Sequence, residues 1–142
     1  MDEKYQCIGR NIGEIHRASI MYFANEFSKF NIGAGQYVFL LNLYRNEGIT
    51  QDELTSIVKL DKATTARALK KLEDEGYVKR VRREDDKRFY SIMLTEKAKE
   101  IKQDIYSIMD NWEEKMKNCF TDEESKELIR LLNKLNNRIY KK

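Results

Sequence analysis

The sequence predicts a mainly α-helical protein of class α+β, in which the β-structure is one two-stranded hairpin near the middle of the chain. Three observations support this fold class. Apolar residues recur at helical spacing through most of the 142 residues. Two short runs, Tyr77–Arg83 and Phe89–Leu94, alternate instead with the two-residue period of a strand. The connector between these runs, residues 84–88, is polar and typical of a turn.

The N-terminal third predicts two helices. The first is long, and its apolar residues share one stripe: Ile8, Ile12, Ile15, Phe23, Phe27 and Phe30. Residues 31–35 contain two glycines and break this helix. Residues 36–46 are apolar on nearly every side, so we expect the second helix to be buried on several sides.

A helix-turn-helix is expected next. Thr50 and Glu53 have the spacing of a capping box, which opens a short third helix through Ile57. Asp61 is a good N-cap for a fourth helix, because its carboxylate can accept from the free N–H groups of the first turn. Gly76 ends that helix where the backbone can take a positive φ. Two helices separated by a few residues form a helix-turn-helix.

The fourth helix has an apolar and a basic face. The apolar stripe consists of Thr65, Leu69 and Leu72. The residues outside this stripe are Lys62, Thr64, Arg67, Lys70 and Lys71. Taken alone, a basic face is more typical of an ordinary solvated surface than of a binding site.

The hairpin concentrates positive charge. Residues 79–88 contain six basic and three acidic side chains, a net charge of +3, and the whole chain also carries +3. The rest of the chain is therefore neutral overall. Such focused charge is the footprint expected of a phosphate-binding surface, and it favours a recognition helix followed by a β-wing that lies on duplex DNA.

The C-terminal part predicts two more amphipathic helices. Thr95 can cap a fifth helix whose apolar residues are Ile101, Ile105, Ile108, Trp112 and Met116. Thr121 and Glu124 form a second capping box, which opens a last helix with Ile129, Leu132, Leu135 and Ile139.

The long terminal helices need a partner for their apolar stripes. We expect residues 1–30 and 95–142 to form a helical dimerisation region around a winged helix-turn-helix at residues 31–94. A symmetric homodimer would cover the stripes by using one surface twice. The alternative is a monomer whose end helices pack only on each other.

Composition narrows the remaining classes. A chain with 41% hydrophobic and 36% charged residues suits a soluble helical protein, and neither an apolar run near ~18 residues nor a signal core is present, so we expect a cytoplasmic protein without a membrane span. Cys7 and Cys119 form no motif, and the single histidine, His16, cannot build a zinc site. No nucleophile elbow or phosphate-cradling glycine loop is present, so neither an enzyme nor a cofactor is expected.

The residues resemble the MarR (multiple antibiotic resistance) family of transcription regulators over essentially the whole chain. The strongest stretch is LDKATTARALKKLEDEGYVKR, followed by Asp86-Lys87-Arg88 and Leu94-Thr95. The one departure is Ala98, where the family usually has glycine. The resemblance implies a homodimeric winged-helix protein that binds pseudo-palindromic operators, usually as a repressor. Many members of the family release DNA on meeting a small phenolic ligand or an oxidant.

The resemblance also implies roles for individual residues. Arg67 corresponds to the arginine that reads base edges in the major groove, where its planar fork suits guanine O6 and N7. Arg88 corresponds to the wing arginine that enters the minor groove, and Asp86 to the acid that holds an arginine such as Arg83 or Arg88. Alternatively, Asp86 is simply a turn residue. The complete expected DNA-binding set is Lys62, Ala63, Thr64, Arg67, Lys70, Arg83, Asp86, Lys87 and Arg88.

The effector is less well defined by the sequence. The resemblance implies a pocket for a small phenolic or aromatic anionic ligand, and the candidate contacts are His16, Arg17, Tyr37 and Tyr44. A packed or surface histidine is the simpler interpretation of His16. Oxidant-sensing members of the family use a cysteine near the start of the first helix, which would be Cys7, although a structural cysteine is the simpler interpretation. A different class of function, a winged helix that binds protein, would give no reason for arginine at both groove-facing positions.

Overall fold

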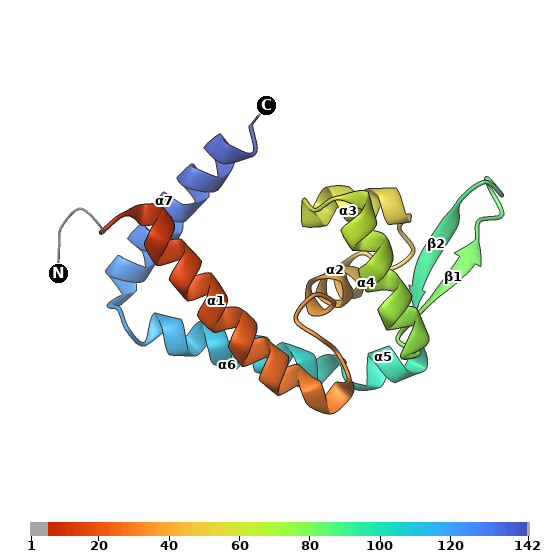
Figure 1. The fold of residues 1–142 in the computed structure, drawn as a ribbon, viewed down its shortest axis with the longest axis horizontal. Coiled ribbons are helices and arrows are strands. Elements are labelled where there is room, and N and C mark those ends of the chain that lie inside the picture. The colour runs from red at the N-terminus through yellow and green to blue at the C-terminus, as the bar shows by residue number, and fades with distance from the viewer. Residues whose placement is uncertain (1–5, 142) are drawn as a thin grey trace. The chain divides into compact units, whose positions relative to one another are not determined.

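The computed structural model describes residues 6–141, and they fold as helices with one two-stranded sheet (Figure 1). In chain order the elements are α1 (Ile8–Phe27), the 3-10 helix η2 (Ser28–Phe30), α2 (Tyr37–Arg45), α3 (Gln51–Val58), α4 (Lys62–Asp74), β1 (Val78–Arg82), β2 (Tyr90–Leu94), α5 (Glu96–Glu100), α6 (Lys102–Lys117) and α7 (Asp122–Ile139). This confirms the predicted fold class, a helical chain with a winged helix-turn-helix and long helices at both ends.

The chain forms two compact units. Unit 1 is Met1–Ile105 and contains every element from α1 to α5 together with the start of α6. Unit 2 is Tyr106–Lys142 and contains the rest of α6 and α7.

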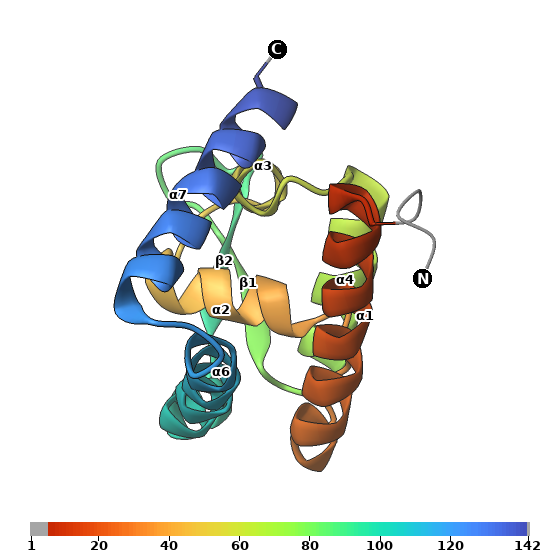
Figure 2. The same cartoon turned by 90° about the vertical axis from the view of Figure 1, so that its left-hand side faces the viewer.

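The helix-turn-helix of unit 1 is built from α2, α3 and α4, and Figure 2 shows α2 running across the direction of α4. Asp61 caps α4 as predicted, and the predicted stripe of Thr65, Leu69 and Leu72 is buried. At the end of α4, Gly76 has a φ of 81°, which a glycine adopts without steric cost. The short turn between α3 and α4 includes Lys59 in the left-handed region, with φ 57°.

The wing is an antiparallel hairpin in which Val78 is paired with Leu94 and Arg82 with Tyr90. The inward face of β2 carries the buried residues Ile92 and Leu94. Backbone hydrogen bonds tie its base to the segment before α3: Ile92 N–H donates to Ile49 O at 2.8 Å, and Gly48 N–H donates to Ile92 O at 2.9 Å. The hairpin then extends beyond the helices and ends in the turn near residue 86 (Figures 1 and 2).

The core of unit 1 lies between the helix-turn-helix, the base of the wing and the end of α1. Its fully buried apolar residues include Phe27, Ile32, Phe39, Leu40, Leu43, Leu54, Leu69, Leu72, Ile92 and Ile105. The second helix is buried on several sides, as expected, since Arg45 is its one exposed residue.

The end of α1 is joined to the winged part through aromatic side chains. Phe23 and Phe27 are buried, and their rings lie 4.9 and 5.3 Å from the ring of Tyr37. The buried Tyr77 donates its hydroxyl to the carbonyl of Phe30 at 2.6 Å, which links the exit of α4 to the segment after α1. The helix itself stops at Phe27, and the predicted last turn to Phe30 is a 3-10 turn that Asn31 ends with φ 56°.

Two details of the sequence prediction were wrong. The fifth helix is not continuous, because α5 ends at Glu100 and α6 begins at Lys102. At this break the Tyr44 hydroxyl donates to Ala98 O at 2.5 Å, and this is the carbonyl that the Lys102 N–H would use in an unbroken α-helix. The Thr50 box is half formed, since Glu53 N–H donates to Thr50 Oγ1 but the Glu53 carboxylate accepts from that same hydroxyl.

Unit 2 contains the complete capping box predicted at Thr121, where both reciprocal hydrogen bonds with Glu124 are present. The helix α7 that follows has no buried residue, and its large apolar side chains Ile129, Leu132 and Ile139 are exposed. Among residues 6–141, no helix combines the length and the apolar character needed to cross a membrane.

Candidate nucleic-acid interface

The exposed face of α4 begins with a chain of hydrogen bonds. Asp61 accepts from the Thr64 N–H at 2.8 Å and from the Thr64 hydroxyl at 2.7 Å. The same hydroxyl accepts from Arg67 Nη2 at 3.3 Å. The two bonds from Thr64 hold the pKa of Asp61 below its ordinary value, so the carboxylate remains charged. The helix cap therefore orients Thr64, and Thr64 orients the Arg67 guanidinium.

The lysines expected on this helix are exposed at its two ends. Lys62 lies in the first turn with Nζ 3.9 Å from Asp52 of α3, and Lys70 lies 2.7 Å from Asp74 one turn further on. Both pairs are solvent-exposed, and such pairs contribute only ~0–1 kcal/mol, so either lysine can exchange its carboxylate for a phosphate at little cost. Ala63 is also exposed, and its methyl group offers only apolar contact.

An open cavity of about 510 Å³ runs beside the recognition helix α4. Arg67, Lys70 and Lys71 line one side of it, and the loop residues Gly35 and Gln36 line the other. The three cations along one wall favour an anion at that side of the cavity.

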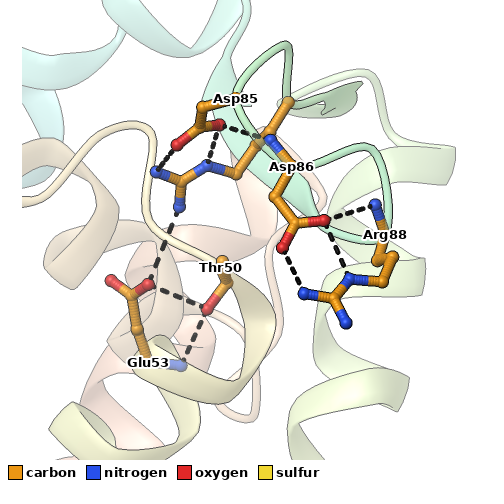
Figure 3. Close-up of polar contacts among 6 residues, drawn as sticks. Thr50, Glu53, Asp85, Asp86 and Arg88 are labelled. Carbon is orange, nitrogen blue, oxygen red and sulfur yellow. Dashed lines mark hydrogen bonds and ion pairs between the residues drawn. The ribbon is translucent and has the colours of Figure 1, made fainter.

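The wing turn holds Arg88 through Asp86 (Figure 3). Asp86 Oδ1 accepts from Arg88 Nε at 2.9 Å, and Asp86 Oδ2 accepts from Arg88 Nη2 at 2.7 Å. This pair lowers the pKa of Asp86 and raises the pKa of Arg88. The sequence expectation that Asp86 holds an arginine is confirmed, and that arginine is Arg88. Its side chain is 82% exposed at the end of the wing.

Arg83 lies in a different setting. Its Nε and Nη2 atoms lie 3.1 and 3.2 Å from Asp85, and its Nη1 atom lies 3.9 Å from Glu53 at the start of α3. Figure 3 shows Glu53 on the side of the wing turn, with Thr50 beside it. The hydrogen bond from Arg83 lowers the pKa of Asp85. Lys87 is exposed between the two arginines in sequence.

The four residues expected to line a ligand pocket are absent from the linings of the cavity at the wing and the cavity beside α4. Tyr37 is packed against Phe23 and Phe27, and burial raises the pKa of its hydroxyl. The hydroxyl of Tyr44 is bonded to Ala98 O, whereas His16 and Arg17 are exposed on α1.

Cys7 and Cys119 are both exposed free thiols. No group of three or more His, Cys, Asp or Glu side chains within residues 6–141 is arranged to hold a metal ion.

Sequence reasoning missed two positioning groups at this surface. Asp61 was expected to cap the helix but not to orient Arg67 through Thr64. Thr64 lies three residues from both Asp61 and Arg67, and this helical spacing allows the two successive hydrogen bonds. Glu53 was expected as a cap residue alone, and its approach to Arg83 joins residues 30 positions apart, which no local pattern reveals.

Comparison with known proteins gives one consistent result. The MarR family model matches residues 32–89, which cover the helix-turn-helix, β1 and the wing turn. The HTH-type transcriptional regulator YybA of Bacillus subtilis is 33% identical over 92% of this chain and 87% of its own length.

Solved structures extend the similarity to the whole fold. A MarR transcriptional regulator from Methanosarcina mazei is 40% identical, with a TM-score of 0.85 over 92% of this chain and 94% of that one. A MarR family transcriptional regulator from Listeria monocytogenes, solved in complex with a 26mer DNA, is 30% identical, with a TM-score of 0.87 over 94% of this chain and 89% of that one.

Proposed function

The chain belongs to the MarR family of DNA-binding, non-enzymatic transcriptional regulators, and we propose that it acts as a homodimeric repressor of an inverted-repeat operator. The similar Listeria protein was solved with a 26mer DNA, which supports DNA as the partner of this chain too. The observation that carries the proposal is the pair of exposed arginines, Arg67 on α4 and Arg88 on the wing, each held by an acid-anchored hydrogen-bond chain.

In the proposed complex, α4 enters the major groove. Arg67 reads base edges there, and Ala63 and Thr64 approach bases and phosphates from the first turn. Lys62 and Lys70 contact phosphates, which fixes the register without reading sequence. Preorganised side chains lose less conformational entropy on binding, which favours a specific complex over a loose electrostatic one.

The wing supplies the second contact. Arg88 reaches the minor groove beside the half-site, where narrow A·T-rich segments have an enhanced negative potential. Its Nε and Nη2 atoms are bonded to Asp86, so the Nη1 edge of the exposed guanidinium is directed away from that carboxylate. Lys87 lies beside it in the turn and contacts a phosphate in this proposal.

The homodimer is proposed to form through the long terminal helices, residues 1–30 and 95–142, around the winged part at residues 31–94. Support comes from exposed apolar side chains at both ends of the chain: Ile8, Ile12 and Ile15 on α1, and Ile129, Leu131, Leu132 and Ile139 on α7. Several large apolar side chains exposed on one helix are typical of an interface. A two-fold axis would place two recognition helices roughly 34–36 Å apart, in successive major grooves.

Release by a small phenolic or aromatic anionic ligand completes the proposed mechanism. His16, Arg17, Tyr37 and Tyr44 remain the proposed contacts, with Arg17 pairing a carboxylate. Support is limited to their chemistry and to the half-buried positions of the two tyrosines on α2. Salicylate, a phenolic carboxylate, is a suitable probe. The proposal expects it to raise the melting temperature and weaken DNA binding, and no effect on either up to millimolar concentration would remove the ligand step.

The DNA step is tested by competition between duplexes. Full-length protein is titrated into a labelled duplex that it selects from a random pool, with unlabelled duplexes of the selected and of a scrambled sequence as competitors. A specific regulator prefers the selected competitor by about a thousandfold or more. Equal competition by both sequences, with a steep dependence on salt, would indicate non-specific architectural binding instead.

A further inference from the structure

The two arginines near the wing turn differ in what surrounds them. The Arg83 side chain is 34% exposed, whereas that of Arg88 is 82% exposed. Every nitrogen of the Arg83 guanidinium faces a carboxylate: Nε and Nη2 face Asp85, and Nη1 faces Glu53. The Arg88 guanidinium uses only Nε and Nη2 toward Asp86. The guanidinium of Arg83 therefore has a protein carboxylate near both of its edges, whereas that of Arg88 has one near a single edge.

The two carboxylates that face Arg83 belong to different elements. Asp85 is in the wing turn, and Glu53 is in the first turn of α3. Glu53 is itself fixed, because its Oε1 atom accepts from the Thr50 hydroxyl at 3.1 Å and its N–H donates to that oxygen at 3.2 Å. Thr50 is buried, so this end of the chain of contacts is anchored in the helix-turn-helix (Figure 3).

Arg83 also lies far from the base of the hairpin, near its turn. The backbone ties between the hairpin and the preceding segment involve Ile92, near the base. Arg83 lies just beyond the end of β1, where its N–H donates to Phe89 O at 3.0 Å. A contact this far out controls the tilt of the turn much more strongly than a contact at the base. The tilt in turn decides where Arg88 sits, because Arg88 is bonded inside the same turn.

We propose that Arg83 is a positioning residue: by bridging Asp85 of the wing turn and Glu53 of α3, it sets the angle of the wing and thereby the reach of Arg88, and it does not contact DNA itself. This assignment replaces the direct DNA contact expected from the sequence. It rests on the proposed function, because its main consequence appears in the flank preference of DNA binding.

A phosphate contact and a positioning role predict opposite signs for Glu53→Gln. If Arg83 contacts phosphate, removing the Glu53 charge frees Arg83 and reduces repulsion, so affinity rises on every duplex. If Arg83 positions the wing, removing that charge loosens the turn, so the preference for A·T-rich flanks falls. Glutamine retains the side-chain oxygen that accepts from the Thr50 hydroxyl, which preserves the helix cap.

The experiment compares Arg83→Gln, Arg83→Lys, Glu53→Gln and the double variant Arg83→Gln/Glu53→Gln, with Glu84→Gln as a matched control that removes one exposed carboxylate from the same turn. Affinities are measured on one inverted repeat with A·T or G·C flanks. We expect Arg83→Gln and Glu53→Gln each to reduce the preference for A·T-rich flanks about two- to fivefold, which is the range of an exposed ion pair. The double variant should lose no more of this preference than either single variant. Arg83→Lys should behave like Arg83→Gln, because lysine cannot bridge two carboxylates as a planar fork does.

Higher affinity of Glu53→Gln on both flanks, together with wild-type behaviour of Arg83→Lys, would overturn the proposal and make Arg83 a phosphate contact. Hydrogen exchange of the DNA-free protein provides an independent readout. The Arg83 amide, bonded to Phe89 O, should exchange faster in Arg83→Gln and Glu53→Gln than in Glu84→Gln. An unchanged exchange rate of the Arg83 amide would contradict the bridge, whatever the DNA-binding result. A protein that selects no DNA sequence would separately reject the proposed function.

Discussion

Asp86 holds the Arg88 guanidinium with two side-chain hydrogen bonds of 2.9 and 2.7 Å, and it also accepts from the Arg88 N–H at 3.1 Å. The three-residue segment Asp86–Arg88 thus fixes both the backbone and the side chain of Arg88, which is 82% exposed. This relationship makes the wing turn a preorganised element rather than a flexible basic loop.

Arg88→Ala should weaken operator binding by roughly 1–3 kcal/mol and reduce the preference for A·T-rich flanks, because no side chain then enters the minor groove while the dimer and α4 are intact. Asp86→Ala should produce a milder version, since it loosens the arginine without removing it. Binding curves on A·T- and G·C-flanked duplexes measure both effects. Lys87→Ala is the matched control and should weaken the two duplexes alike. Undiminished affinity of Arg88→Ala on both would show that the wing stays off the DNA.

The wing should keep its order at ordinary pH and lose it in acid. The pKa values of Asp85 and Asp86 are lowered, chiefly by hydrogen bonds from Arg83 and Arg88, so folding favours the deprotonated carboxyls. Their contribution is therefore complete above the ordinary carboxyl pKa and is lost only as pH falls through the lowered values. NMR signals of the turn amides should stay constant from about pH 8 to 5 and change below about pH 4. A change near pH 6 would contradict this assignment.

Arg67→Ala should relax base preference at one position of each half-site and cost ~1–3 kcal/mol on the selected duplex. Lys62→Ala should instead weaken all duplexes evenly and lower the salt slope by about one for each phosphate that is no longer neutralised. Thr64→Val removes the hydroxyl that bridges Asp61 and Arg67, so it should resemble a weaker Arg67→Ala. Equal losses on selected and random duplexes with Arg67→Ala would make Arg67 a phosphate contact.

Tyr77→Phe should destabilise the folded protein by ~1–3 kcal/mol in urea, because it leaves the Phe30 carbonyl without the 2.6 Å hydrogen bond from the buried hydroxyl. Tyr90→Phe is a matched control: its hydroxyl accepts from Arg82 at an exposed site, so we expect a loss under ~0.5 kcal/mol. Equal effects of the two substitutions would refute the structural role of the Tyr77 hydroxyl.

Leu132→Asp on α7 should produce monomers at micromolar concentration, because it places a charge on an exposed apolar face that the proposed dimer covers. Multi-angle light scattering gives the mass directly. Lys134→Asp, at a polar position on the same helix, controls for the change of charge. A wild-type chain that is a well-folded monomer at these concentrations would reject the dimer.

The features that the sequence predicted well are local. Asp61, Thr95 and Thr121 cap the helices that follow them, because a cap is defined by residues three positions apart. The two-residue alternation over Phe89–Leu94 likewise predicted the strand that the structure has at Tyr90–Leu94.

The features that the sequence did not predict depend on interactions between distant residues. The break between α5 and α6 coincides with a bond from Tyr44 to Ala98, 54 positions away, and the helical periodicity of Ile101 and Ile105 continues through it. The approach of Glu53 to Arg83 is of the same kind. For the proposed ligand residues, the family resemblance suggested a grouping, whereas the ring of Tyr37 packs against Phe23 and Phe27.

Selection of duplexes from a random pool by the full-length protein, with the mass of the resulting complex measured, tests the proposed mode of DNA binding. Two copies of the chain should bind one duplex that contains an inverted repeat, with half-site centres ~10 bp apart and A·T-rich outer flanks. An enriched motif without two-fold symmetry, one chain per duplex, or no enriched motif at all would contradict a dimer that reads DNA through paired α4 helices and wings.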